Sequence, residues 1–155
     1  MTVKCVAIGN RIMCDDSIGI KVAEELSSKM MKEGIELIIG ETDGDYSLSL
    51  IENGDLLFII DSTYMDISPG TVTVTRINDL IVKNQIFSQH QPNLINLINT
   101  YRKKVDGYVI GIEVDKIDFN LKLSDTLKNK LPQICEEVDK FICKTIYYSN
   151  KQLKG

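Results

Sequence analysis

The chain has 155 residues and a formal net charge of −4, which fits one domain able to bury about two-thirds of the surface that its unfolded chain exposes. Its basic residues are scattered, so we expect no positive track for a nucleic-acid backbone. The longest apolar runs, such as 56–60, are far shorter than the ~20 residues that cross a bilayer. These properties argue against nucleic acid and the membrane as partners.

The four cysteines indicate a reducing compartment. Cys5, Cys14, Cys135 and Cys143 show no C-x-x-C spacing, and we recognise no secretory leader ahead of them. A zinc knuckle or a redox dithiol is therefore not expected. We expect reduced thiols in a cytoplasmic protein.

The first half of the chain alternates strand patterns with helix patterns. Apolar runs predict strands over 3–9, 35–39 and 56–60, and 3.6-residue periodicity predicts helices over 17–33 and 46–52. The connections between these elements are short. Strands and helices that alternate in this way indicate right-handed crossovers and a parallel sheet.

The second half is less regular, and residues 77–86 give no clear pattern. The alternating β-branched run 71–75 predicts an edge strand, and 107–113 predicts a further buried strand. Helices are expected to begin at Pro92 and Pro132, because proline suits the first turn of a helix. The tail, residues 149–155, is expected to be frayed.

Together these patterns predict a single domain over residues 1–148 with an α/β fold, a three-layer α/β/α sandwich around a twisted, mostly parallel sheet. In the common strand order of such sheets, the first and third strands are neighbours at the point where the winding reverses. Asp15 and Asp16 follow the first strand, and Asp61 follows the third. We therefore expect these carboxylates at one edge of the sheet, where ligands of α/β proteins bind.

Each of these acids also has a simpler interpretation. An aspartate before a helix commonly caps it by accepting backbone N–H groups, and with two adjacent aspartates one can cap while the other faces the crevice. Asp61 either faces the crevice or caps a loop through Ser62 or Thr63. If two carboxylates do share a crevice, each raises the pKa of the other unless a cation lies between them, which argues for a metal.

His90 is the single histidine of the chain. A lone histidine is commonly a packed or surface residue, but this one lies in the polar segment 88–92, just before a predicted helix. The positive end of that helix disfavours protonation and keeps the imidazole able to coordinate. Two carboxylates and one imidazole suit nickel, zinc or iron. If His90 binds metal, no Ser-His or Cys-His dyad can form.

Several fragments, in this order and spacing, resemble the hydrogenase maturation proteases, endopeptidases that trim the C-terminal extension from the large subunit of nickel-iron hydrogenases. The fragments are Ile8-Gly9-Asn10 with Asp15-Asp16 and Gly19, then Ile59-Ile60-Asp61, Pro69-Gly70-Thr71-Val72, Ser88-Gln89-His90-Gln91, and Val109-Ile110-Gly111-Ile112-Glu113 with Leu123-Ser124. The resemblance implies the three-layer fold. It also implies that Asp16, Asp61 and His90 are the metal ligands.

The resemblance further implies that the metal is nickel supplied by the substrate, a hydrogenase large-subunit precursor, with other divalent ions as possible substitutes. It makes Asp16, Asp61 and Asp43 the catalytic candidates. Asp43-Gly44 matches the start of the family's Asp-Gly-Gly-Thr loop, but Asp45 and Tyr46 follow here in place of Gly-Thr. We expect a cytoplasmic monomer, although the sequence leaves the oligomeric state open.

Two other functions remain open at the level of the sequence. A receiver-like signalling domain also places paired acids after its first strand, and Asp61 would then accept a phosphoryl group. Against it, no lysine ends the strand 109–112, and Gly9-Asn10 separates the first strand from the acidic pair. The other alternative is a module of the same fold that senses nickel and binds the large subunit without cleaving it.

Overall fold

The computed structural model describes residues 1–83 and 91–155. Within these residues, the strands are β1 (Val3–Ile8), β2 (Glu36–Glu41), β3 (Leu56–Thr63), β4 (Val72–Arg76) and β5 (Asp106–Glu113). The helices are the short 3-10 helix η1 (Cys14–Ser17), α1 (Ile18–Lys32), α2 (Gly44–Ser49), α3 (Ile77–Lys83), α4 (Gln91–Thr100) and α5 (Asp125–Lys154).

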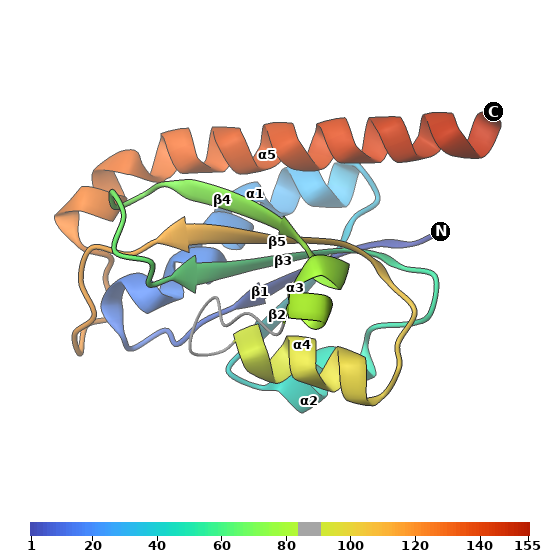
Figure 1. Ribbon diagram of the computed structural model, residues 1–155. Coiled ribbons are helices and arrows are strands. Elements are labelled where there is room, and N and C mark those ends of the chain that lie inside the picture. Colours follow the sequence, from blue (N-terminus) through green and yellow to red (C-terminus); the bar gives the residue numbers. More distant parts are fainter. Residues whose placement is uncertain (84–90) are drawn as a thin grey trace.

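The strands form one twisted sheet in the order β2-β1-β3-β5-β4 (Figure 1). All neighbouring strands are parallel except β4, which pairs antiparallel with β5. Helices α1 and α5 cover one face, and α2, α3 and α4 cover the other (Figure 1). The predicted α/β/α sandwich with a mostly parallel sheet is therefore confirmed, and so is the edge strand, which the structure shows to be antiparallel.

The central strand β3 divides the core into its two layers. All of its residues are buried, and successive side chains point to opposite faces. Phe58 and Ile60 pack on the side of α1 and α5, and Leu57 and Ile59 pack on the side of α3 and α4. A strand buried on both faces needs a continuous apolar run, which is what residues 56–60 supply.

The C-terminal helix differs from the prediction at both ends. It begins at Asp125, where Ser124 accepts a hydrogen bond from the Leu127 N–H, so Pro132 lies inside the helix and does not open it. It also continues to Lys154, so the expectation of a frayed tail over 149–155 is wrong. Two lysines in the last turn favour this end, because cations interact well with the carboxyl terminus of a helix dipole.

Two further differences concern β3 and the region after β4. The strand β3 continues to Thr63 because its pairing with β5 extends to Glu113, so Asp61 lies within the strand and not beyond it. Over residues 77–83, for which no clear pattern is predicted, α3 follows directly after β4. No helix in the described parts of the chain has the length and hydropathy that a membrane crossing requires.

Helix α1 lies very close to the sheet at Gly19. A Cβ atom at this position would lie 2.5 Å from the carbonyl oxygen of Ile60 and 2.9 Å from that of Ile8. Both distances are shorter than van der Waals contact, so only glycine allows the helix backbone to approach β1 and β3 this closely. The contact fixes the start of α1, and therefore η1, above the ends of the two central parallel strands.

We predict that Gly19→Ala destabilises the fold, although alanine is the better helix former by about 1 kcal/mol. The new methyl group must displace backbone atoms, so the free energy of unfolding should fall by about 1–3 kcal/mol. Urea unfolding followed by circular dichroism measures this change. Ser28→Ala, on the exposed face of the same helix, is the control and should leave stability unchanged or slightly increased.

Candidate metal and catalytic site

Asp16 lies in η1 and is almost completely buried, with 2% of its surface exposed. Its Oδ1 accepts hydrogen bonds from the hydroxyl of Ser62, at 2.9 Å, and from the phenol of Tyr64. Its Oδ2 accepts the backbone N–H of Asn10 at 3.0 Å. These contacts direct the carboxylate from η1 toward β3.

Asp61 is also buried, and it meets Asp16 through Ser62. The Oδ1 of Asp61 accepts the backbone N–H of Ser62 at 2.7 Å and lies 3.4 Å from its hydroxyl oxygen, the same hydroxyl that contacts Asp16. A single hydroxyl therefore lies within hydrogen-bond reach of both carboxylates. The structure brings these two candidate ligands together at the carboxyl edge of the sheet, which is the edge where the parallel strands end.

The simpler interpretations are only partly correct. Neither η1 nor α1 has a side-chain hydrogen bond at its N-cap, so the expectation that one aspartate of the pair caps the helix is wrong. Asp61 does accept the N–H of Ser62, as the loop-capping interpretation expected. That bond still leaves Asp61 facing the same serine hydroxyl as Asp16.

Asp15 has a different task from its neighbour. It is fully buried and accepts four hydrogen bonds from the connection between β5 and α5. The donors are the backbone N–H groups of Asp115 (3.0 Å), Lys116 (2.8 Å) and Ser124 (2.8 Å) and the hydroxyl of Ser124 (2.7 Å). Asp15 therefore anchors this connection beside the site.

Glu113, at the end of β5, anchors the other loop beside the site, the one that follows β3. It is 3% exposed and accepts the hydroxyl of Thr63 at 2.7 Å and the backbone N–H groups of Met65, Asp66 and Ile67. This anchor fixes the loop that carries Tyr64. The only signal in the sequence was a carboxylate at the end of a buried strand, and sequence reasoning gave it no role.

Tyr64 was also missed, because nothing in its local sequence marks it. Burial, together with its hydrogen bond to Asp16, raises the pKa of the Tyr64 phenol above its ordinary range. The group is therefore a neutral O–H donor at physiological pH. Along with Ser62, it holds one oxygen of Asp16 in a defined direction.

Asp43 lies at the same edge of the sheet, after β2. It caps α2, since its Oδ1 accepts the Tyr46 N–H at 2.9 Å. It lines a small pocket with Ile8, the last residue of β1, and with Leu94 of α4. Asp43 therefore caps α2 and lies near the end of β1.

His90 lies outside the described residues, directly before α4. Its place among the metal ligands therefore stays a prediction. Of the three predicted metal ligands, the structure describes Asp16 and Asp61.

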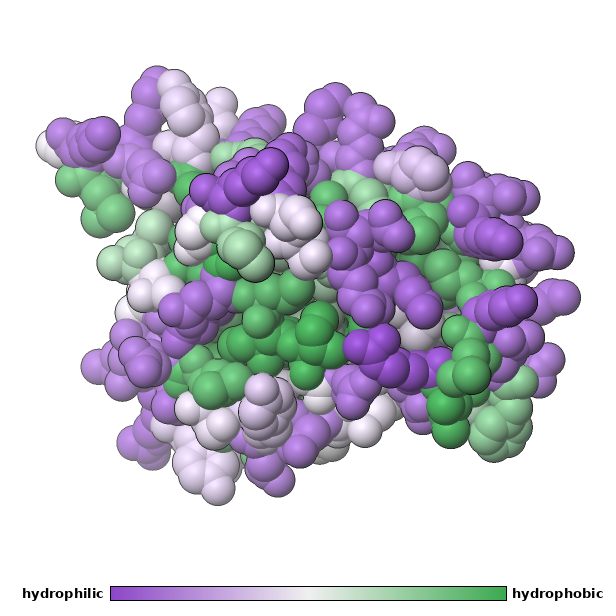
Figure 2. Space-filling model, turned by 180° about the vertical axis from the view of Figure 1, so that it is seen from behind, coloured by the Kyte–Doolittle hydropathy of each residue, from purple (hydrophilic) through white to green (hydrophobic). Residues whose placement is uncertain are grey.

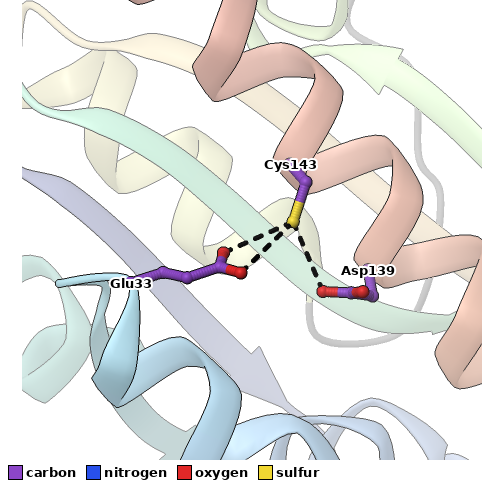
Figure 3. Close-up of side chains that lie close together, drawn as sticks. All are labelled: Glu33, Asp139 and Cys143. Atoms are coloured by element: carbon purple, nitrogen blue, oxygen red, sulfur yellow. Dashed lines mark hydrogen bonds between the residues drawn. The ribbon is translucent and has the colours of Figure 1, made fainter.

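Another group of ligand-type side chains lies at the opposite end of α1 (Figure 3). The thiol of Cys143 contacts Glu33 at 3.3 Å and Asp139 at 3.5 Å, and Lys29 forms an ion pair with Asp139. Burial and the neighbouring carboxylates raise the pKa of Cys143 to about 11, so the thiol is a hydrogen-bond donor at neutral pH. These contacts tie α1 to α5 and belong to no part of the candidate site.

We predict that Asp15→Asn lowers stability more than Asp16→Asn. Asparagine keeps one acceptor oxygen, and its NH₂ group would face donors that now bind a carboxylate. Because hydrogen bonds to a charged group contribute about 1.5–3 kcal/mol each, the free energy of unfolding of Asp15→Asn should fall by at least that amount. Urea unfolding measures both variants. Equal stability of Asp15→Asn and the unsubstituted protein would contradict the anchoring role.

Comparison with known proteins identifies the family. The family model described as hydrogenase maturation protease matches residues 20–140. The hydrogenase 2 maturation protease of Escherichia coli is 24% identical over 148 residues, covering 89% of this chain and 88% of the relative. The structure resembles the maturating endopeptidase HybD of E. coli, with a TM-score of 0.79, 20% identity and 94% of each chain covered. It also resembles HybD of Thermococcus kodakarensis, a [NiFe] hydrogenase maturation protease, with a TM-score of 0.72, 26% identity and coverage of 91% of this chain and 99% of that one. The chain therefore belongs to the hydrogenase maturation protease family.

Proposed function

We propose that the chain is an endopeptidase that removes the C-terminal extension of a nickel-loaded hydrogenase large-subunit precursor. Its family and the names of its relatives support this reaction. The observation that carries the proposal is the shared hydroxyl of Ser62, which lies within hydrogen-bond reach of both Asp16 and Asp61. Two carboxylates held this close at the ligand-binding edge of an α/β sheet would be stabilised by a cation bound between them.

In this proposal nickel is part of the substrate and is not a resident cofactor. Asp16 and Asp61 would contact it together with His90, whose role rests on the sequence. Two carboxylates and an imidazole suit a borderline divalent ion and leave coordination positions for ligands from the precursor. Other divalent ions of similar preference could substitute in vitro.

The proposed catalysis begins with positioning. Metal contact would hold the scissile peptide beside the carboxylates, so that a bimolecular step becomes effectively unimolecular. Nickel held by Asp16, Asp61 and His90 would supply a Lewis acid able to polarise the peptide carbonyl, or a carboxylate such as Asp16, Asp61 or Asp43 would activate water. The O–H donors on Asp16 keep its direction fixed during this step.

A cysteine nucleophile receives no support. Burial and the charge of Asp15 raise the pKa of Cys14, the thiol nearest to the acidic pair in sequence. Since the thiolate is the reactive form, a raised pKa disfavours nucleophilic attack at neutral pH. This leaves carboxylate and metal chemistry as the proposed route.

The proposed setting is the cytoplasm, and the large-subunit precursor is the proposed partner. The four cysteines are free thiols, in keeping with a reducing compartment. The monomeric state expected from the sequence stays a prediction. Membership of the protease family does not favour the receiver-like alternative.

The direct test mixes the purified protein with precursor large subunit, with and without nickel, and follows the precursor's C-terminus by mass spectrometry. We expect a defined C-terminal fragment only with nickel-loaded precursor. Nickel-dependent binding without any cleavage would overturn the protease proposal in favour of the non-cleaving module.

The site residues are tested by Asp16→Asn, Asp61→Asn and His90→Gln. Each variant should remain folded by circular dichroism but lose about 10²-fold or more of its processing rate, as expected when a group acting on the reacting atoms is removed. Asp79→Asn, an exposed acid on α3, is the control and should process at the original rate. Full activity of all three site variants would contradict the assignment.

A further inference from the structure

Four exposed hydrophobic side chains lie on the two loops that border the acidic pair. Ile12 is 49% exposed, Ile117 37%, Phe119 82% and Leu121 67%. We call these four residues the apolar collar. Hydrophobic side chains gather over the loop end of the molecule, at the lower right of Figure 2.

The backbone of the apolar collar is ordered by direct pairing of the two loops. Met13 and Asn120 form a parallel β-bridge. The Asn120 N–H donates to the Ile12 carbonyl at 3.0 Å, and the Cys14 N–H donates to the Asn120 carbonyl at 2.9 Å. Ile12 therefore lies beside the segment that carries Phe119 and Leu121.

The collar is also joined to the candidate site by hydrogen bonds. The Ile12 N–H donates to the side chain of Asn10, and the Asn10 N–H donates to the carboxylate of Asp16. On the other loop, Asp15 holds the backbone of Asp115 and Lys116. The backbone of the collar is therefore linked directly to the acidic pair.

Exposure of large apolar side chains on ordered loops points to a binding surface. Water disfavours such surface, and a contiguous exposed apolar area commonly marks a contact with another protein. Loops that are already held in place lose little conformational freedom on binding. The fold therefore keeps the collar exposed and prepared for an apolar partner.

The charges around the collar are balanced. Asp115 and Asp118 are exposed on the same loop as Lys116 and Lys122. An apolar centre with a polar rim of mixed sign is the usual anatomy of a protein–protein interface. It favours an apolar docking segment over a strongly charged one.

A broader apolar area in the middle of Figure 2 lies over the edge strand β2. Leu37 and Ile39 of β2 are half-buried and pack against the cluster that contains Ile20 and Ala23 of α1. These two side chains contribute to the packing at the sheet edge, whereas the collar residues lie on the loops beside the acidic pair.

We propose that the apolar collar docks an apolar surface of the large-subunit precursor and so delivers the scissile segment to Asp16 and Asp61. This inference rests on the proposed function and adds to it the surface that recognises the folded substrate. The collar residues are positioning residues and take no part in bond cleavage.

The test is the double variant Phe119→Ser/Leu121→Ser, assayed with nickel-loaded precursor. We expect KM to rise at least about tenfold, as for the loss of interface anchors, with kcat changed less than about twofold because no reacting group is removed. Met31→Ser/Leu153→Ser is the matched control, because these side chains are similarly exposed, at 78% and 71%. It should show unchanged KM and kcat.

A conservative variant separates docking from folding. Phe119→Leu keeps an apolar side chain and should retain a KM within about threefold of the original, since hydrophobic area is what the collar supplies. A KM that stays unchanged in the double variant, or a fall confined to kcat, would overturn the docking role. Failure of the unsubstituted protein to cleave any nickel-loaded precursor would instead overturn the proposed function, so the two failures are distinguishable.

Discussion

The contact on which the site depends is the meeting of two buried carboxylates at one serine hydroxyl. Asp16 comes from η1 and Asp61 from β3, and Ser62 reaches both. Anionic groups this close are costly to bury unless a cation or several donors compensate them. The position of α1, set by Gly19 against the carbonyl groups of β1 and β3, is what makes the meeting possible. The packing of the fold thus brings two carboxylates together at the edge of the sheet, which is the arrangement that the proposed nickel contact requires.

Around this pair, two other buried acids act as anchors. Asp15 gathers N–H groups from the β5–α5 connection, and Glu113 gathers them from the loop after β3. These backbone N–H groups lie outside the strands, and one carboxylate accepts several of them. This holds the irregular backbone in place. The loops beside the candidate site are therefore ordered from inside the protein, and their outer side chains are left for a partner.

Much of the architecture could be predicted because the spacing of apolar residues along the chain indicates each strand and helix locally. Apolar runs marked β1, β2, β3 and β5, and the order of strands and helices implied a parallel sheet with its ligands at the carboxyl ends of the strands. Local pattern could not reveal which acid of the pair faces the site. That choice depends on Ser62, Tyr64 and Ser124, which are distant in sequence from Asp15 and Asp16. The start of α5 was misplaced because Pro132 was given more weight than the Ser124 cap.

The bond between Asp15 and Ser124 joins residues 109 positions apart, and this has a consequence for the order in which the molecule assembles. Closing so long a loop costs conformational entropy, and contacts between residues so far apart in the sequence slow folding. Ser124 at the same time caps the helix that completes one layer of the core. The surroundings of Asp15 can therefore be completed only after residue 124 has been synthesised, and a chain cut short before it would carry Asp16, Asp61 and His90 without the Ser124 donors that hold Asp15.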